Sequence, residues 1–447
     1  MPSKKVTIIG AGLAGPLLAI GLVERGFEVE IHERRPDLRR VAQSAGRSIN
    51  LAVSARGIHA LQQAGLWHAV SELTVPMRGR MMHAQSGDLS FQPYGKDETE
   101  FISSLSRADL NIALLDAAQA RGVRIHFDSR MVGADLPTGR LRFRNERTGE
   151  ETNLETTVVI GVDGANSALR SEMLRHTRLN FSQAFPDYGY KELTIPAGSG
   201  MDRNALHIWP RGSYMLIALP NIDETFACIL FLPFEGSVSF QQIGLRDEIK
   251  PFFQAQFPDA LAMMPHLVEN YAASPLGSMV TIKCSPWHAE GRFLLLGDAA
   301  HAIVPFFGQG LNCSFEDVTV LLAIVDQYDA NWPLVFSTLE QARKPNTDAI
   351  ADLALENFVE MRDHVADPAF LLRKKVELAL EARFPGRFVP KYAMVTFHRV
   401  PYSVARSRGI VQDGILTELC GGIGQVEDID FSKAAKLIEP LTPLEFA

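Results

Sequence analysis

Two glycine-rich segments far apart in the chain carry the strongest chemical signal. The first, Val6 to Gly15, reads Val-Thr-Ile-Ile-Gly-Ala-Gly-Leu-Ala-Gly, and the second, Gly297 to Asn312, contains Gly-Asp-Ala-Ala-His and Phe-Gly-Gln-Gly-Leu-Asn. Glycine permits a tight turn, and it lets the free N–H groups of a helix N-terminus approach a phosphate. Because both segments have this character, they predict one long dinucleotide lying across a folded domain.

The first segment has the form Gly-x-Gly-x-x-Gly, directly after an apolar β-branched run and before a helical pattern. Gly10 permits the turn, Gly12 lets the backbone approach a pyrophosphate, and Gly15 lets the helix pack closely on the sheet. Leu13 and Ala14 lie between the last two glycines and are assigned to the same cofactor contact. An ordinary glycine-rich turn is the alternative.

An acidic residue follows at the expected distance. The second strand, Phe27 to Glu33, ends on Glu33, where a carboxylate can bind the hydroxyls of an adenosine ribose. Arg34 comes next and is assigned to the same site. Strand, helix, second strand and terminal acid together predict a bound dinucleotide, but they do not distinguish NAD from FAD.

The second segment favours FAD. Leu294 to Leu296 predicts a buried strand, so Asp298 stands at its carboxyl end and can accept hydrogen bonds from the ribityl hydroxyls of a flavin. The helix expected from about Leu311 to Val325 would direct its N-terminal N–H groups at the flavin pyrimidine edge. The residues assigned to this contact are Gly308, Gly310, Leu311 and Asn312. A plain β-α turn with a helix-capping aspartate is the alternative.

A third motif, Asp163-Gly-x-x-Ser-x-x-Arg170, follows a strand expected at Thr157 to Ile160. The three motifs together resemble the single-component flavoprotein monooxygenases, which are aromatic-ring hydroxylases that use FAD and a reduced nicotinamide. The resemblance implies that Asp163 is associated with both cofactors and that NADPH has no nucleotide-binding domain of its own. Consistent with this, we find no second Gly-x-Gly-x-x-Gly after a strand.

Further blocks narrow the resemblance to the kynurenine 3-monooxygenase family over roughly residues 5 to 405. The blocks are Gly46 to Ala52, Met77 to Met81, Gln92 to Gly95, Gly189 to Leu193, His207 to Pro210, Ala354 to Met361 and Pro390 to Phe397. The resemblance implies that the chain uses NADPH and O2 to hydroxylate L-kynurenine at ring position 3. That reaction belongs to tryptophan catabolism or to the biosynthesis of NAD or secondary metabolites. A flavin hydroperoxide does the chemistry in this class, so we expect no catalytic side chain.

The resemblance also implies a substrate site. Arg80 is expected to bind the substrate carboxylate as a guanidinium fork, beside the hydroxyl of Tyr94. Asn357 and Glu360 share one face of an expected helix and, with Tyr392, are expected to hold or shape the amino-group end. From spacing alone, Arg80 could equally be a surface arginine, and the helix face a solvated polar stripe.

Four apolar residues are expected to surround the substrate ring, and these are Met215, Ile217, Phe307 and Met361. A simple core position is the alternative reading for the two methionines and Ile217. No side-chain acid is assigned at the position of Phe307.

Several basic residues lie near the expected cofactor. Arg47 and Arg107 are expected to contact the flavin or its phosphates, with surface positions as the alternative. His301, beside the Gly-Asp motif, is expected to be structural, and His207 and Trp209 are expected to be packing residues of a strand.

Composition limits the partners and the compartment. The net charge of -8, without a basic patch, argues against a nucleic-acid partner or an anionic membrane surface. The four scattered cysteines form no Cys-x-x-Cys, which disfavours a zinc site and favours free thiols in a reducing cytoplasm. We expect no signal peptide and no membrane anchor, and a monomer or homodimer.

The pattern of elements predicts an α/β fold in which a Rossmann-like FAD-binding domain contains an inserted antiparallel β-sheet substrate domain and is followed by a C-terminal helical region, the aromatic hydroxylase fold. The expected FAD-binding parts are residues 1–75, 106–175 and 277–345. The expected substrate-domain parts are residues 76–105 and 176–276, and the helical region is 346–447.

Three other functions stay open at this point. The first is the same chemistry on a substituted kynurenine or another aminobenzoyl compound. The second is a non-catalytic protein that keeps the flavin fold, and the third is a pyridine-nucleotide dehydrogenase. The last would not require the Gly-Asp and Gly-Gln-Gly elements of the second segment.

Overall fold

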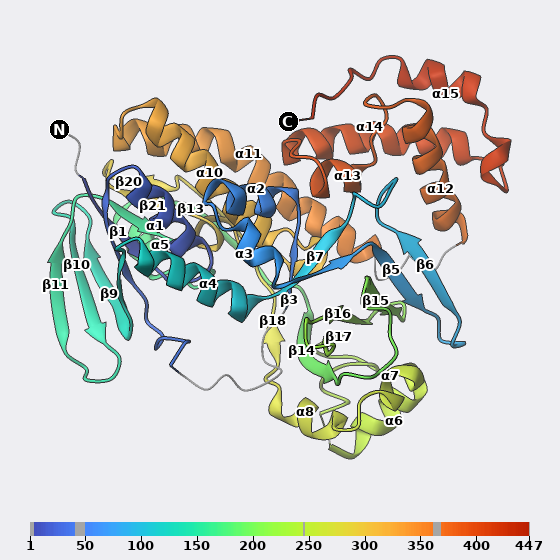
Figure 1. Cartoon of the computed structure of the whole chain (residues 1–447), viewed down its shortest axis with the longest axis horizontal. Helices are drawn as coiled ribbons and strands as arrows, with labels where there is room; N and C mark the ends of the chain where they lie inside the picture. Colours follow the sequence, from blue (N-terminus) through green and yellow to red (C-terminus); the bar gives the residue numbers. More distant parts are fainter. Residues whose placement is uncertain (1–3, 41–49, 245, 361–367, 447) are drawn as a thin grey trace. The chain divides into compact units, whose positions relative to one another are not determined.

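The computed structural model describes residues 4–40, 50–244, 246–360 and 368–446. The chain divides into two compact units (Figure 1). Unit 1 comprises Met1–Thr74, Leu105–Pro186 and Met279–Ala351, and unit 2 comprises Val75–Ser104, Asp187–Ser278 and Asp352–Ala447.

Unit 1 is built on a six-stranded sheet with the strand order β20-β21-β12-β1-β2-β8. The strands are β1 (Lys5–Ile9), β2 (Glu28–His32), β8 (Arg124–His126), β12 (Val159–Gly161), β20 (His288–Ala289) and β21 (Phe293–Leu295). All neighbours are parallel except β20 and β21. The carboxyl ends of β1, β2, β12 and β21 therefore meet at one edge, which is where ligands bind in open α/β sheets.

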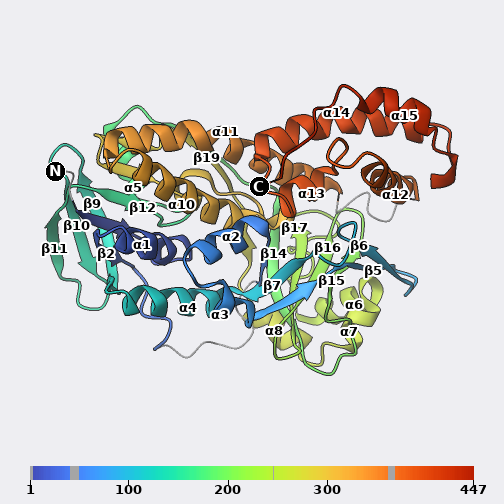
Figure 2. The ribbon, with the colours of Figure 1, turned by 45° about the horizontal axis from the view of Figure 1, so that its top comes forward.

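The helices of unit 1 pack around this sheet. They are α1 (Ala14–Glu24), α2 (Ala55–Gln63), α3 (Trp67–Ser71), α4 (Arg107–Ala120), α5 (Ala168–His176), α9 (Asp298–His301), the 3-10 helix η1 (Pro305–Phe307) and α10 (Gly310–Gln327). Helix α1 contacts β1, β2, α4 and α10 (Figure 2). It approaches α10 closely because Gly21 has no side chain, and a Cβ there would lie 2.3 Å from a methyl carbon of Leu322.

Two smaller sheets complete unit 1. One has the order β11-β10-β9, formed by β9 (Ser129–Asp135), β10 (Arg140–Asn145) and β11 (Glu151–Glu155), and the other pairs β13 (Asn180–Ala184) with β19 (Thr281–Ser285). Strand β3 (Asn50–Val53) leads into α2, while β4 (Thr74–Met77) and β7 (Ile102–Ser106) contain two of the boundaries between the units.

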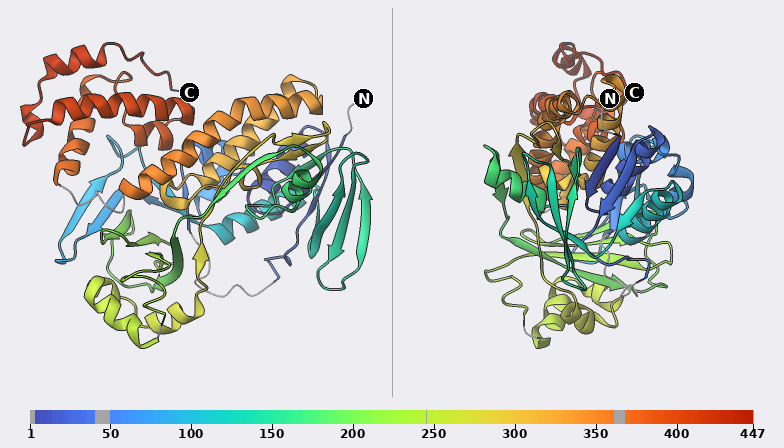
Figure 3. Two further views of the ribbon diagram at one scale, coloured as in Figure 1. Left: turned by 180° about the vertical axis from the view of Figure 1, so that it is seen from behind. Right: turned by 90° about the vertical axis from the view of Figure 1, so that its left-hand side faces the viewer.

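Unit 2 contains a seven-stranded sheet with the order β18-β14-β17-β16-β15-β5-β6. The strands are β5 (Gly79–His83), β6 (Leu89–Pro93), β14 (Tyr188–Ile195), β15 (Ala205–Pro210), β16 (Met215–Pro220), β17 (Phe226–Pro233) and β18 (Gly277–Ser278). Every pair is antiparallel except β5 with β15. Helices α6 (Arg246–Gln256), α7 (Pro258–Ala262) and α8 (Leu267–Ala273) cover one face of this sheet (Figure 3).

The register of this sheet sorts its side chains onto two faces. Trp209, Leu216 and Leu230 belong to the core shared with α6, α7 and α8. Successive side chains of a strand point to opposite faces, so Met215 and Ile217 lie on the other face. Arg80 pairs with Leu206 of β15, and Ile208, two residues further along β15, pairs with Ile217. Arg80, Met215 and Ile217 therefore share the face opposite α6–α8.

The C-terminal helices of unit 2 have a small core of their own, centred on Val376, Leu380 and Leu416. They are α12 (Pro368–Arg383), α13 (Lys391–Thr396), α14 (Tyr402–Cys420), the 3-10 helix η3 (Val426–Asp428) and α15 (Phe431–Ile438). Within the described ranges, no helix is both long enough and apolar enough to cross a membrane.

One expected helix boundary is wrong. The sequence predicted the first C-terminal helix from about Asn346, whereas α11 runs from Trp332 to Val359 without a break. Pro345 lies inside this helix, where proline normally ends or kinks one. The expectation of an α/β fold with an inserted antiparallel sheet and C-terminal helices is confirmed.

Candidate functional site

The glycine turn after β1 has the geometry of a phosphate cradle. Gly10 has φ +106°, and a Cβ there would lie 2.7 Å from the carbonyl oxygen of Val162. A Cβ on Gly15 would lie 2.1 Å from the carbonyl oxygen of Gly10, so this helix can pack at this distance only with glycine. A Cβ on Gly12 would meet nothing within 4 Å. The open side of Gly12 therefore leaves room for a ligand, while Leu13 and Ala14 continue into α1.

Glu33 stands directly after β2, beside this turn. Its Oε2 accepts a 2.8 Å hydrogen bond from the Ala11 N–H, and its Oε1 accepts hydrogen bonds from the backbone and side chain of Arg35. Burial alone would raise the pKa of Glu33, but its contacts with Arg35 and Ala11 more than offset this and hold the pKa below its usual value. The carboxylate is therefore ionised and ready to accept from a sugar hydroxyl, with the exposed Arg34 next to it.

The second glycine segment is fixed to the same unit by Asn312. Its Oδ1 accepts from the Ser54 N–H at 2.9 Å, and its Nδ2 donates to the carbonyl oxygens of Ala52 and Gly308 at 2.8 and 2.9 Å. The side chain thus holds the start of α10 against β3 and α2. The backbone N–H groups of Leu311 and Asn312 belong to the first turn of α10, where helical N–H groups lack an intrahelical acceptor.

The carboxylates of Asp298 and Asp163 are the two acids predicted at this site. Asp298 opens α9, and its side chain is exposed although burial by surrounding atoms raises its pKa, while Arg107 acts in the opposite direction. Asp163 Oδ2 accepts from the Ala168 N–H at 2.7 Å, and its Oδ1 is buried without a hydrogen-bond partner in the part of the chain that the structure describes. Burial raises the pKa of Asp163.

These observations fit a flavin dinucleotide. The open side of Gly12, the ionised Glu33, the exposed Asp298 and the buried Oδ1 of Asp163 are all polar or sterically vacant features around one sheet edge. A buried acceptor without a partner is costly unless a ligand or water satisfies it. The donors and acceptors of unit 1 therefore match the hydroxyls and phosphates of FAD.

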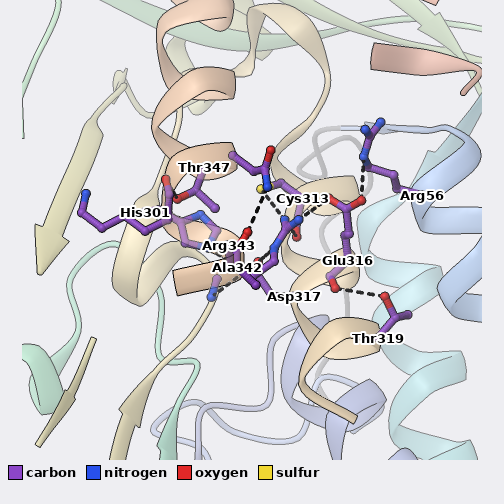
Figure 4. Close-up of polar contacts among 12 residues, drawn as sticks. Arg56, His301, Cys313, Glu316, Asp317, Thr319, Ala342, Arg343 and Thr347 are labelled. Atoms are coloured by element: carbon purple, nitrogen blue, oxygen red, sulfur yellow. Dashed lines mark hydrogen bonds and ion pairs between the residues drawn. The ribbon is translucent and has the colours of Figure 1, made fainter. Parts of the chain in front are cut away.

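A network of ion pairs contacts the loop of Gly297 and Asp298 through the Gly297 N–H (Figure 4). Asp317 Oδ2 accepts from His301 Nε2 at 2.6 Å and from the Gly297 N–H at 3.3 Å, and Asp317 Oδ1 accepts from Arg343 Nε at 2.7 Å. Arg343 also pairs with Glu316 through Nη1, at 2.5 Å. The network joins the flavin loop to α10 and α11.

The electrostatic interactions of this network are strong because His301, Asp317 and Arg343 are buried. Burial alone would lower the pKa of His301. The carboxylate of Asp317 more than offsets this effect, so the pKa of His301 is raised from 6.5 to about 10. Burial raises the pKa of Asp317, and the charges of His301 and Arg343 lower it below its usual value. His301 is thus structural, as the sequence predicted. Asp317 and Arg343 were missed, and the only signal was a charged residue inside each apolar helical pattern.

In unit 2, Arg80 lies beside two tyrosine rings that stack on each other. Its guanidinium carbon is 5.4 Å from the ring centre of Tyr94 and 5.3 Å from that of Tyr392, and the two rings stack at 5.4 Å. Arg80 is only 9% exposed, and within the described ranges its Nε has no hydrogen-bond partner. Burial alone would lower the pKa of Arg80, but Tyr94, Tyr392 and Glu360 raise it, so the guanidinium remains charged.

The other predicted substrate residues are placed as follows by the structure. Glu360 is close enough to affect the pKa of Arg80 and lies 3.8 Å from Lys374 Nζ. Asn357 is buried in the last turn of α11. Met215 and Ile217 share the sheet face of Arg80. Phe307 is buried in unit 1, immediately before Gly308. Arg47 and Met361 lie outside the described residues.

A second polar chain in unit 2 was not predicted. His83 Nδ1 lies 2.7 Å from Asp259 Oδ2, and His83 Nε2 lies 2.8 Å from His207 Nδ1. His207 Nε2 donates to the carbonyl oxygen of Asp202, and Trp209 Nε1 donates to Asp259. His207 and Trp209 are buried, as expected for packing residues, and they also connect β5 and β15 to α7.

Comparisons with known proteins decide the family. A family model described as an FAD binding domain matches residues 3–183 and 261–328, which is more than half of the chain. A kynurenine 3-monooxygenase of Myxococcus xanthus is 52% identical over 444 residues, covering 98% of this chain and 96% of the relative. A kynurenine 3-monooxygenase of Xanthomonas axonopodis pv. citri is 47% identical over 451 residues, covering 99% of this chain and 98% of the relative.

The chain belongs to the kynurenine 3-monooxygenase family. Its FAD-binding domain and its membership of the flavoprotein monooxygenases, both expected from the motifs, are confirmed. Members of this family are enzymes, so the non-catalytic alternative and the pyridine-nucleotide dehydrogenase lose their support.

Solved structures of other monooxygenases share the fold of this member of the kynurenine 3-monooxygenase family. The oxygenase of 2-methyl-3-hydroxypyridine-5-carboxylic acid has a TM-score of 0.67 at 22% identity, covering 83% of this chain and 95% of that chain. PqsL of Pseudomonas aeruginosa, a probable FAD-dependent monooxygenase, has a TM-score of 0.64 at 17% identity, covering 80% of this chain and 96% of that chain. At these identities the likeness extends to the fold alone.

Proposed function

We propose that the chain uses NADPH and O2 to hydroxylate L-kynurenine at ring position 3, giving 3-hydroxy-L-kynurenine. The observation that carries this proposal is the buried guanidinium of Arg80 beside the stacked rings of Tyr94 and Tyr392. A buried cation with an unused donor is a receptor for an anion, and the carboxylate of an amino acid fits the guanidinium fork. The family of the chain identifies which amino acid to test first.

When bound, FAD would supply the redox chemistry, which is acceptance of a hydride from NADPH and activation of O2 towards an electron-rich ring. Glu33 and the N–H groups at the glycine turn would hold its adenosine and phosphate part. Asp163, Asp298 and the first turn of α10 would hold the remainder. Asp317 keeps the Gly297 N–H and His301 in place behind this loop.

The protein's own residues orient the substrate and exclude water. Arg80 binds the substrate carboxylate, and the Tyr94 and Tyr392 hydroxyls can donate to the same group. Burial raises the pKa of both tyrosines, so they remain protonated donors at neutral pH. Glu360 and Asn357 hold the amino-group end, while Met215 and Ile217 offer an apolar wall on the same sheet face as Arg80.

We further propose that the chain acts in the cytoplasm as a monomer or homodimer. Three of its cysteines, Cys228, Cys284 and Cys313, are buried free thiols, which suits a reducing compartment.

Labelled oxygen tests the proposed reaction. The protein is incubated with L-kynurenine and NADPH under ¹⁸O2, and the product is examined by mass spectrometry and NMR. We expect one ¹⁸O atom in a hydroxyl at ring position 3. A hydroxyl at another position, or turnover only of a ring-substituted kynurenine offered in parallel, would reject L-kynurenine as the substrate.

A further inference from the structure

Three residues from distant parts of unit 2 bring two carboxylates and an imidazole together. Glu100 lies in the loop after β6, Glu381 lies in the last turns of α12, and His398 follows α13. One ligand atom from each residue lies within 4.8 Å of the others. Glu100 and Glu381 are each only 6% exposed, so both carboxylates are removed from bulk water.

The loop that carries Glu100 is built around its carboxylate. Glu100 Oε2 accepts a 3.1 Å hydrogen bond from the Lys96 N–H, and Oε1 lies 3.4 Å from Lys96 Nζ. A Cβ at position 95 would lie 2.3 Å from Glu100 Oε2, so Gly95 leaves the space that the carboxylate occupies. His398 Nε2 lies 3.6 Å from Glu100 Oε1, which is too long for a good hydrogen bond.

Glu381 has no such support. Its Oε2 is buried and has no hydrogen-bond partner among the described residues. A buried carboxylate without a partner is costly, and a second carboxylate close by increases the cost. Burial first, and then the charge of Glu100, raise the pKa of Glu381 to about 7. The charge of Lys96 acts in the opposite direction on Glu381, but Lys96 is half exposed and already pairs with Glu100.

We propose that Glu100, Glu381 and His398 form a binding site for a first-row divalent transition metal ion, with Zn²⁺ as the preferred ion. Two carboxylate oxygens and one imidazole nitrogen, with a water as the fourth ligand, are a ligand set that Zn²⁺ accepts in tetrahedral geometry. This ligand set does not suit Mg²⁺, because Mg²⁺ requires nearly octahedral oxygen ligands and keeps several of its waters.

The protonation states suit this ion. Burial lowers the pKa of His398, so its ring is neutral at pH 7. A neutral imidazole has one unprotonated nitrogen, whose lone pair can bind a metal ion. Metal ligands must be deprotonated, so binding would release the proton that Glu381 holds near neutral pH. Ligand atoms around zinc lie about 3.4 Å apart, since each bond is about 2.1 Å long, and the three side chains would close by about 1 Å on binding.

The same three segments also carry residues that interact with Arg80. Tyr94 precedes the Glu100 loop, Lys374 lies two turns before Glu381 on α12, and Tyr392 lies on α13 before His398. A bound ion would therefore tie together the segments that position Tyr94 and Tyr392. Any effect on substrate affinity rests on the proposed function, whereas metal binding itself does not.

The test is a direct titration of the full-length flavoprotein. The protein is treated with a chelator, desalted, and titrated with ZnCl2 or MgCl2 at pH 7.5 in competition with a chromophoric chelator. Glu381→Gln and His398→Gln remove one ligand each. Two controls are Glu98→Gln, in the same loop but paired with Arg78, and His126→Gln, in the carboxylate–imidazole group of Glu30 and His32 in unit 1.

We expect one Zn²⁺ per chain and no competition by Mg²⁺. Both ligand variants should bind Zn²⁺ about 10-fold to 100-fold more weakly, which is the range for changes around a metal site. Both controls should bind Zn²⁺ like the wild type. No Zn²⁺ binding in the micromolar range, or equal binding by wild type and ligand variants, overturns the proposal. X-ray absorption of the zinc-loaded wild type tests it without any variant: oxygen and nitrogen ligands support the site, and thiolate ligands reject it.

Discussion

The side chains of Asp317 and His301 form a buried ion pair, with Asp317 Oδ2 2.6 Å from His301 Nε2 and both residues less than 4% exposed. Because Asp317 also accepts from the Gly297 N–H and from Arg343, one carboxylate connects the loop of the Gly-Asp motif to α10 and α11. The flavin loop thus depends on a residue that has no place in the recognised motifs.

Replacing Asp317 should loosen this loop. Asp317→Asn leaves His301 and the Gly297 N–H without a charged acceptor, while Arg343 keeps its pair with Glu316. Breaking such a buried pair costs on the order of 3 kcal/mol. We expect a lower thermal midpoint and faster loss of FAD, measured by flavin fluorescence. The matched control is Asp326→Asn on the same helix, since Asp326 is half exposed and its pair with Arg25 contributes at most about 1 kcal/mol. Equal effects of both changes would contradict this role.

The same pair predicts a pH dependence. The pKa of His301 is raised from 6.5 to about 10 in the folded chain, so its stabilising charge is fully present below about pH 6.5 and is lost as the pH rises through about 10. The thermal midpoint of the wild type should therefore fall between pH 7 and pH 10. In His301→Gln this fall should be smaller. Parallel curves for the two proteins would show that His301 does not titrate in this range.

Two glycines of the first motif should fail in different ways. Gly12→Ala adds a Cβ in open space, so the chain should fold normally but bind FAD at least about tenfold more weakly, because the methyl group occupies the approach of the pyrophosphate. Gly15→Ala places a Cβ 2.1 Å from the Gly10 carbonyl oxygen, so it should lower the yield of folded protein. Circular dichroism and FAD titration separate the two effects, and wild-type FAD affinity in Gly12→Ala would refute the cradle.

Arg80 and Arg78 provide a matched pair for the substrate site. Arg80→Ala should weaken L-kynurenine binding on the order of 100-fold, because truncating one side of a buried charge pair costs several kcal/mol. FAD content should stay unchanged. Arg78→Ala should have little effect, since Arg78 is half exposed and pairs with the exposed Glu98. Substrate affinity is measured by the change in flavin absorbance, and an unaltered affinity in Arg80→Ala would remove Arg80 from the site.

The elements around the cofactor could be predicted because their signals are local. A strand, a glycine turn and an acid at the end of the next strand are all contained between Val6 and Glu33, and the structure places Glu33 on the Ala11 N–H. The alternation of Ala205 to Pro233 likewise identifies three strands. Arg80 and Tyr94 were found by resemblance, since their own spacing indicates only a surface arginine near an aromatic residue.

The remaining features are relationships between distant residues. Asp317 and Arg343 lie 26 positions apart, and only the packing of α11 on α10 brings them together. His83 and Asp259 lie 176 positions apart, and Glu100, Glu381 and His398 come from three separate segments. Neither periodicity nor composition encodes such pairings. In α11, tertiary packing keeps the helix continuous through Pro345, where local propensity predicts a break.

The most direct test of the account is the coupling of NADPH oxidation to product formation. NADPH consumption is followed with and without L-kynurenine, and the 3-hydroxy-L-kynurenine formed is quantified in the same samples. We predict slow NADPH oxidation without the substrate, a strong increase with it, and about one product molecule per NADPH consumed. Substrate-independent NADPH oxidation that yields only hydrogen peroxide, or a purified chain that neither contains nor takes up FAD, would contradict the account.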